Sequence, residues 1–259
     1  MGASGFLGRA LCATLEQSGI TVFRYSRSTR PGFYGWDPSS GEMDTEPLEQ
    51  ADAVVNLAGE DIAGGRWTTA RKQVLRDSRV GSTQLLVSTL VKLKRPPAVL
   101  VNASAVGYYG HRGDEAVFEQ SAPGHGFLSE LCQAWEGAAM PAMQRGIRVV
   151  IPRFGLVLST HGGALARMLP AFKLGVAGRL GSGKQFMTWI ALSDAVSMLR
   201  FLLTSDVFGP INAVAPEAVT NEEFTATLGR IVRRPTMLPV PVFALKAALG
   251  ELSQVLLEG

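Results

Sequence analysis

The glycine-rich start of the chain, Met1-Gly-Ala-Ser-Gly-Phe-Leu-Gly8, constrains the fold more than any other segment. Glycines occupy positions 2, 5 and 8, and a helical apolar stripe of Leu7, Leu11 and Leu15 begins inside the segment. Glycines at this spacing permit a tight strand-to-helix turn with free backbone N–H groups, and the helix N-terminus attracts an anion. The segment therefore predicts a dinucleotide pyrophosphate site, although its spacing is G-x-x-G-x-x-G rather than G-x-G-x-x-G.

Only Met1 precedes this turn, where a Rossmann-type fold places a buried strand. Two interpretations follow: the first strand lies upstream of this chain, or the sheet lacks one central strand. Without that strand we expect two neighbouring strands to have exposed edges. Adding upstream apolar residues should then raise the melting temperature and the cofactor affinity.

Length and composition exclude several classes of protein. With 259 residues, 46% apolar and 18% charged, the chain is long enough for one large domain with a small lobe. The net charge of +3 is too small to indicate nucleic-acid binding, and no apolar run is long enough for a membrane span. Cys12 and Cys132 are too few for a disulfide framework, and His111, His125 and His161 lack metal-ligand spacing. We expect a cytoplasmic protein that binds no metal, nucleic acid or membrane.

Strands and helices alternate along the first part of the chain. The apolar patterns predict helices at 5–18, 68–94 and 129–145, and strands at 20–25, 51–58, 99–104 and 147–151. This alternation is typical of an α/β fold with a doubly wound parallel sheet of Rossmann type.

Beyond residue 153 the alternation loosens and glycines become frequent. We expect a helix at 164–174, an extended segment at 185–190, a helix at 193–203, a strand at 211–214 and a final amphipathic helix. The predicted body is therefore 1–158, with its sheet completed by about 193–215. A small C-terminal substrate lobe comprises 159–192 and 216–259.

The turn after the second predicted strand decides which dinucleotide fits. It reads Ser26-Arg27-Ser28, with Arg30 nearby and no acidic residue between Thr21 and Trp36. A carboxylate there would bind the ribose diol of NAD, whereas a guanidinium accepts the 2′-phosphate of NADP. The arginines could instead form a solvated loop, but their place after a glycine turn and a strand favours NADP.

Two other segments carry possible chemistry. Gly178 to Gln185 resembles a triphosphate-binding loop, but Gln185 has no hydroxyl for Mg²⁺, and neither a buried strand nor a helix flanks it. We therefore reject phosphate hydrolysis. Tyr108-Tyr109 follows a predicted strand, where open α/β sheets place their ligand crevice; simple aromatic packing is an equal alternative.

Together these residues resemble the extended short-chain dehydrogenases/reductases. More narrowly, the chain is similar to atypical members of the NAD-dependent epimerase family, whose biochemical role is largely unassigned. The resemblance spans nearly the whole chain and rests on these segments: Gly2-x-x-Gly5-x-x-Gly8, Asp52 to Glu60, Ser104 to Gly110, Trp135-Glu136, Arg153 to Leu158, Gly181 to Ile190 and Thr220 to Phe224. It implies that a strand before Gly2 and a segment after Gly259 are missing.

The resemblance also implies a role for individual residues toward NADP. The pyrophosphate would lie on Gly2, Ser4, Gly5, Phe6 and Leu7, and the 2′-phosphate on Ser26 and Arg27. Leu57, Ala58 and Gly59 would lie beneath the adenine side. Arg79 and Leu158 would line the nicotinamide half.

The catalytic pair of the family is not matched. Its Tyr-x-x-x-Lys positions fall on Leu128 and Cys132, and its carbonyl-polarising Ser or Thr falls on Ala105, one residue from Ser104. Neither Leu128 nor Cys132 can transfer a proton at neutral pH in that role. One hypothesis is therefore an NADP-dependent epimerase or oxidoreductase with an unknown small-molecule substrate and a rebuilt site.

The candidate catalytic residues of that rebuilt site are Ser104, Tyr108 and Tyr109, with Arg79 or Lys184 as the cation beside a tyrosine. Trp189 and Gln185, cleft elements of the lobe, favour this enzyme hypothesis. The other hypothesis, favoured by Leu128 and Cys132, is a non-catalytic NADP(H)-binding sensor or interaction protein.

Overall fold

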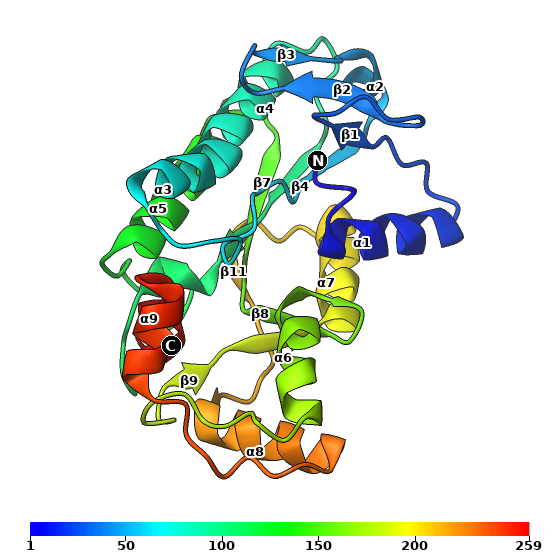
Figure 1. Ribbon diagram of the computed structural model, residues 1–259. Helices are drawn as coiled ribbons and strands as arrows, with labels where there is room; N and C mark the ends of the chain where they lie inside the picture. The colour runs from blue at the N-terminus through cyan, green and yellow to red at the C-terminus, as the bar shows by residue number, and fades with distance from the viewer. Residues whose placement is uncertain (259) are drawn as a thin grey trace.

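A parallel sheet with strand order β11-β7-β5-β4 forms the centre of the computed structural model, which describes residues 1–258 (Figure 1). Its strands are β4 (Ala53–Asn56), β5 (Val99–Asn102), β7 (Arg148–Phe154) and β11 (Gly209–Ala213), with the short β6 (Ser104–Ala105) also paired to β7. All four residues of β5 are buried, which explains why this strand is apolar almost throughout. The predicted Rossmann-type parallel sheet is confirmed.

Helices cover both faces of this sheet (Figure 1). One face carries α3 (Thr69–Arg76), α4 (Ser82–Leu90) and α5 (Phe127–Ala139), and the other carries α1 (Phe6–Gln17) and α7 (Leu192–Thr204). Val99 and Val101 pack in the same core cluster as α1 and α7, whereas Leu100 packs with α4. Successive side chains of a strand point to opposite faces, so an apolar strand packs against both helix layers.

The strands β1 (Tyr25–Ser26), β2 (Tyr34–Asp37) and β3 (Glu42–Met43) form a separate small sheet, followed by α2 (Glu46–Gln50). The predicted strand at 20–25 is thus wrong except at its end. Within the described residues, 20–24 form no backbone hydrogen bonds to β4. On their other side, Arg24 O accepts one hydrogen bond from Tyr34 N (2.8 Å). Along the edge of β4, Met1 N donates to Val55 O (2.7 Å), and Leu57 N donates to Met1 O (3.2 Å).

The long helix predicted at 68–94 is interrupted. Between α3 and α4 lies a π-helical turn, η1 (Asp77–Gly81), and Ser82 Oγ donates to Ser78 O (2.7 Å) inside this widened turn. The helix predicted at 129–145 is also divided, because α5 gives way to the 3₁₀ segment η3 (Met140–Arg145). Pro141 at its start has no N–H to continue the α-helical bonding.

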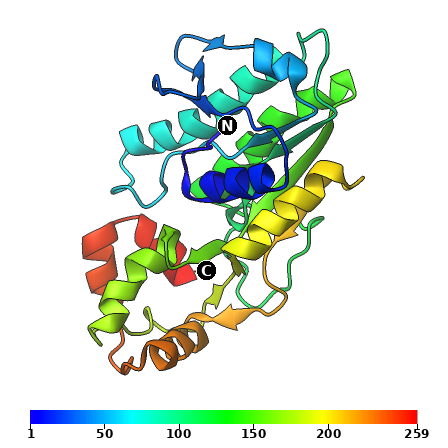
Figure 2. The same ribbon diagram turned by 90° about the vertical axis from the view of Figure 1, so that its right-hand side faces the viewer.

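The lobe lies at the other end of the molecule from β2 and β3 (Figure 2). β8 (Leu156–Ser159), which begins before the boundary expected at 159, pairs with β10 (Trp189–Ala191), and β9 (Phe186–Met187) pairs with β12 (Val219–Thr220). The helices of the lobe are α6 (Gly163–Lys173), α8 (Asn221–Val232), α9 (Val242–Leu249) and α10 (Leu252–Glu258). The one final helix expected from the sequence is therefore two, separated at Gly250. None of the helices within residues 1–258 is both long and apolar enough to cross a membrane.

Candidate functional site

The glycine turn at residues 1–8 is built to leave its helix N-terminus accessible. Gly2 has φ +73°, and a Cβ on Gly2 would lie 2.6 Å from Leu57 C, while one on Gly8 would lie 2.2 Å from Gly2 O. Gly5 caps α1 without a side-chain hydrogen bond, and no acidic residue lies in the first turn. Free N–H groups at a helix start, with close backbone packing behind them, fit a pyrophosphate.

The lobe reaches back to this turn through Phe6. A Cβ on Gly162 would lie 2.6 Å from the Phe6 ring, so the loop between β8 and α6 packs directly on that side chain. Leu158 of β8 pairs with Gly163 at the start of α6, and a Cβ on Gly163 would lie 3.2 Å from the Phe6 ring. Leu158 therefore lies on the side of the glycine turn that carries Phe6.

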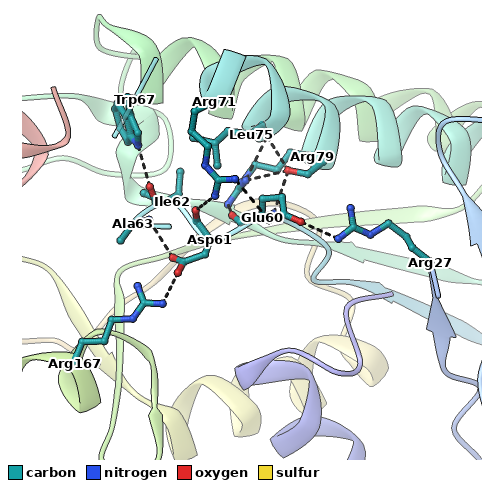
Figure 3. A network of polar contacts seen from close by, with 11 residues as sticks. Arg27, Glu60, Asp61, Ile62, Ala63, Trp67, Arg71, Leu75, Arg79 and Arg167 are labelled. Carbon is teal, nitrogen blue, oxygen red and sulfur yellow. Dashed lines mark hydrogen bonds and ion pairs between the residues drawn. The ribbon is translucent and has the colours of Figure 1, made fainter. Parts of the chain in front are cut away.

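The turn after β1 is held by its own serines and arginines. Ser28 N donates to Ser26 Oγ (3.2 Å), and Arg30 Nε donates to Ser28 Oγ (3.2 Å). Arg27 is 59% exposed and extends toward the segment after β4, where it donates to Glu60 Oε1 at 2.8 Å (Figure 3). Ser26 and Arg27 thus lie at the expected edge, but Arg27 has a carboxylate partner that the sequence did not predict.

Arg79 comes from the π-helical turn η1 and lies against the chain that follows β4 (Figure 3). Its guanidinium donates to Glu60 O (2.9 Å) and lies over the Trp135 ring at 5.3 Å, and burial lowers the pKa of Arg79. A Cβ on Gly59 would meet Arg79 Cζ at 3.1 Å. The structure therefore places Leu57, Ala58, Gly59 and Arg79 together.

Asp61 connects this segment with the lobe. Its carboxylate forms an ion pair with Arg167 of α6, and Arg71 of α3 donates to its backbone oxygen (Figure 3). Although partial burial opposes it, the hydrogen bond from Arg167 lowers the pKa of Asp61. An acidic pair, Glu60-Asp61, thus lies among four arginines: Arg27, Arg71, Arg79 and Arg167.

Leu128 and Cys132, the positions that the resemblance assigns to the proton-transfer pair, are packed against other side chains and backbone. A Cβ on Gly107, in the 3₁₀ turn η2 (Val106–Tyr109), would lie 3.3 Å from Leu128 Cβ and 4.0 Å from Cys132 Sγ. Burial, with a contribution from Glu136, raises the pKa of the Cys132 thiol to about 11. Neither side chain can exchange a proton near pH 7.

Ser104 and Tyr109 are bound within a buried charge network. Ser104 Oγ donates to Glu136 Oε1 (2.6 Å), and Arg153 donates to both carboxylate oxygens of Glu136 (2.9 and 2.8 Å). The Tyr109 hydroxyl accepts from Arg153 (2.9 Å) and donates to Asn212 Oδ1 (2.7 Å). Burial alone lowers the pKa of Arg153, but the bonds to Glu136 and Tyr109 outweigh it and raise that pKa.

Tyr108 differs from these two residues. Its ring lies 3.5 Å from Arg153 Cζ, and its hydroxyl makes no hydrogen bond to any residue from 1 to 258. The cation beside the tyrosines is therefore Arg153, whereas Arg79 packs on Trp135. In the lobe, Gln185 is buried and donates to Leu256 O (2.8 Å).

The chain shares this architecture with known proteins. The NAD dependent epimerase/dehydratase family matches residues 1–214. The epimerase family protein MT2273 of Mycobacterium tuberculosis is 47% identical over 253 residues, covering 96% of this chain and 83% of the relative. The chain belongs to the NAD dependent epimerase/dehydratase family.

Two further relatives match over the full length of this chain. The epimerase family protein YfhF of Bacillus subtilis is 36% identical and is covered to 87%. The crystal structure of the human epimerase family protein SDR39U1 with NADPH superimposes with a TM-score of 0.90 at 36% identity, covering 100% of this chain and 88% of that one.

In this family member, sequence reasoning missed Glu60, Asp61, Arg167 and the pair formed by Glu136 and Arg153. Signals for three of them were present. Glu60 and Asp61 come just after an apolar strand and Gly59, at the edge where open α/β sheets bind their ligands. Arg153 ends an apolar run, and a charged residue in a buried strand requires a partner. Arg167 had no such signal, because only the folded chain brings α6 to Asp61.

Within residues 1–258, no three His, Cys, Asp or Glu side chains group closely enough to hold a metal ion.

Proposed function

We propose that the chain is an NADP(H)-binding protein of the extended short-chain dehydrogenase/reductase type, with epimerase- or oxidoreductase-like character and an unassigned small-molecule substrate. The observation that supports this most is the uncapped, glycine-lined start of α1 beside a serine–arginine turn without a carboxylate. The similar human protein SDR39U1 was crystallised with NADPH. The free, buried thiols of Cys12 and Cys132 support a reducing, cytoplasmic setting.

The proposed cofactor follows one path along the described residues. Its pyrophosphate lies at the start of α1, its adenosine between the β1 turn and the end of β4, and its nicotinamide toward Arg79 and Leu158. The residues proposed for contact are Gly2, Ser4, Gly5, Phe6, Leu7, Ser26, Arg27, Leu57, Ala58, Gly59, Arg79 and Leu158. When bound, NADP(H) supplies hydride transfer; the chain's own contribution is binding and orientation.

Arg27 and Ser26 are the first test of this proposal. Charge-assisted hydrogen bonds contribute about 1.5–3 kcal/mol each, so Arg27→Ala should weaken NADPH by about 10- to 100-fold and leave NADH nearly unchanged. Isothermal titration calorimetry of both cofactors measures the two affinities. Equal losses for NADPH and NADH would refute a 2′-phosphate contact at Arg27.

For catalysis, Tyr108 is the candidate whose hydroxyl is available, because those of Ser104 and Tyr109 already have protein partners. If turnover exists, Tyr108→Phe should lower the rate by about 10²–10⁴-fold, the usual range for a general acid. The assay is a screen of carbonyl compounds and sugar nucleotides with NADPH. Tyr109→Phe is the parallel variant, and full activity in both would exclude this mechanism.

The second candidate function is a non-catalytic NADP(H) sensor or interaction protein. The packing of Leu128 and Cys132 on Gly107 favours it, since no proton donor takes the family position. Tight NADPH binding without turnover across the screen would favour the sensor. Mass spectrometry of small molecules that co-purify with the chain would separate the two by revealing a bound substrate or the cofactor alone.

A further inference from the structure

The outer end of the lobe is formed by two chain segments that lie side by side. One is the end of α6 with the loop after it, residues 173–179, and the other is the end of α8 with the loop after it, residues 230–240 (Figure 1). Arg234 Nε donates to Lys173 O (2.9 Å), and the two backbones touch again at Gly178, where a Cβ would overlap the other segment. We call these two segments the lobe tip.

Large apolar side chains of the lobe tip are exposed to solvent. Leu174 and Leu238 are each 76% exposed, and Met237 is 88% exposed. Val176 and Ile231 in the same two segments are exposed as well. Single exposed apolar residues are common on protein surfaces, but five of them on two adjoining segments indicate an interaction surface.

The charged residues of the lobe tip are all basic. The chain has no acidic residue between Glu136 and Asp194, nor between Glu223 and Glu251. Glu222 and Glu223 lie in the first turn of α8, at the end of that helix away from the lobe tip. Four cations of the lobe tip are exposed and form no ion pair with any residue from 1 to 258: Lys173, Arg230, Arg233 and Arg234.

The opposite end of the molecule differs in charge. Residues 37–52, which include most of β2 together with β3 and α2, contain six acidic residues and no lysine or arginine (Figure 1). Lys92, Lys94 and Arg95 lie beside α2 and offset part of this charge. A negatively charged surface therefore attracts the lobe tip more than the opposite end, and this difference orients the chain before contact.

We propose that the lobe tip docks on a membrane of anionic phospholipid, with Leu174, Met237 and Leu238 entering the interface and the cations facing the headgroups. Apolar side chains beside lysine and arginine are typical of surfaces that lie in a membrane interface, and the cytoplasmic leaflet is anionic. The exposed side chains project from two loops, and a fluid bilayer accepts them without a matching shape, whereas a protein partner requires complementary packing. The sequence-based expectation of no membrane binding concerned spanning segments, which such docking does not need.

Co-sedimentation with lipid vesicles tests the charge part of this proposal. The probes are vesicles of phosphatidylcholine and phosphatidylglycerol in equal amounts, and vesicles of phosphatidylcholine alone. The chain should bind the anionic vesicles far more tightly, and added salt should weaken that binding. Lys173→Gln combined with Arg233→Gln should weaken it about 10- to 30-fold. Lys92→Gln combined with Lys94→Gln removes the same charge at the opposite end and should change it less than about 2-fold.

Fluorescence tests the apolar part. In anionic vesicles that contain brominated phosphatidylcholine, emission from Leu238→Trp should shift to the blue and be quenched. Phe208→Trp, at an exposed apolar position outside the lobe tip, is the control and should show neither change. Both variants carry the same four native tryptophans, so the difference between them reports the introduced side chain. Met237→Ser combined with Leu238→Ser should weaken vesicle binding by about 10-fold or more, whereas Phe208→Ser should not.

Four results would overturn the proposal. The first is no binding to anionic vesicles at low salt, and the second is vesicle binding in which Leu238→Trp stays unquenched. Tighter binding to soluble poly-glutamate than to vesicles would assign the lobe tip to an acidic protein partner. Self-association that Met237→Ser with Leu238→Ser abolishes, seen by light scattering, would assign it to a second copy of this chain. None of these results bears on the proposed cofactor, because no residue proposed for contact with NADP(H) belongs to the lobe tip.

Discussion

The turn that carries Gly2, Gly5 and Gly8 and the turn that carries Gly107 both follow the sheet edge where ligands bind, yet their surroundings differ. Around the first, glycines keep the backbone close, and the hollow beside it is lined by Ser4 and three arginines as well as by Glu16 and Phe33. Around the second, Leu128 and Cys132 fill the space. The Ser104 hydroxyl is bound to the buried Glu136 carboxylate, and the Tyr109 hydroxyl to the buried Arg153 guanidinium.

The residues proposed for cofactor binding and the positions that the resemblance assigns to proton transfer therefore form separate parts of this fold. The proposed cofactor site depends on the backbone of the glycine turn and on exposed cations, none of which belongs to α5. Proton transfer at the family position would depend on residues 128 and 132 of α5 and on Gly107 of η2, which lies opposite them. A chain can therefore keep the cofactor elements while its proton-transfer position becomes part of the core.

The largest expected effect concerns the buried pair at the second turn. Glu136→Gln should lower the free energy of unfolding by about 3–5 kcal/mol, because it leaves the Arg153 charge buried without its carboxylate. Urea denaturation followed by circular dichroism measures this loss. Glu130→Gln, an exposed position on the same helix, is the control and should change stability by less than about 0.5 kcal/mol.

A loss below about 1 kcal/mol for Glu136→Gln would mean that water reaches the pair. The hydroxyls of Ser104 and Tyr109 would then be open to substrate, and the contrast between the two turns would fail. NADPH affinity, measured well below the melting temperature, should remain within about 2-fold of the wild type.

At the first turn, Gly8→Ala should weaken NADPH binding by about 100-fold, or about 2.7 kcal/mol, because its Cβ would lie 2.2 Å from Gly2 O. The turn must shift to relieve that contact, which moves the N–H groups proposed for the pyrophosphate. Gly137→Ala on α5 is the matched control, since no atom lies within 4 Å of its Cβ. Equal affinities for both variants would contradict a site at the start of α1.

Much of this architecture follows from the sequence, and the exceptions have physical causes. The glycine spacing and the alternation of strands and helices suffice to predict the sheet and α1, because both depend on local patterns. The break at η1 is not predictable in this way: Asp77 to Gly81 has low helix propensity, but no local pattern specifies a π-helical turn, and the Ser78 hydroxyl there accepts a hydrogen bond from Glu60 N of the chain after β4. The short β1 likewise reflects missing pairing rather than low strand propensity.

The residues of the candidate site also fall into those that local sequence predicts and those that depend on tertiary contacts. The residues proposed at the glycine turn and at Ser26-Arg27 can be named from the sequence, because the contacts proposed for the ligand involve backbone groups and one short turn. The pairing of Glu136 with Arg153 is not predictable from the sequence, because it depends on how α5 packs against β7.

A third, smaller effect tests the enclosure of Cys132. The thiol's pKa is about 11 in the folded chain against an ordinary value near 9, so between these values the unfolded state has lost a proton that the folded state keeps. Wild-type stability should therefore fall as pH rises through this window, by about 1.4 kcal/mol at pH 10 from this group. Urea denaturation at pH 8 and pH 10 measures the decline.

Cys132→Ala should lack this part of the alkaline decline, whereas Cys12→Ala keeps Cys132 and should show all of it. Identical slopes in wild type and Cys132→Ala would mean that the thiol ionises normally. Cys132 would then be accessible to solvent, and the proton-transfer position would be open rather than filled.

The smallest expected effect lies between the two regions, at the ion pair of Asp61 with Arg167, which connects the segment after β4 to α6 of the lobe. Both side chains are largely exposed, so a double-mutant cycle with Asp61→Asn and Arg167→Met should give a coupling of only about 0.2–1 kcal/mol. The coupling should shrink in 1 M salt. The lowered pKa of Asp61 means that this contribution is complete above its ordinary pKa of about 3.9 and is lost as pH falls through the folded value. A coupling above about 2 kcal/mol that resists salt would mean that the pair is rigid and desolvated, and that the lobe is fixed to the cofactor-binding body rather than joined to it by a weak surface contact.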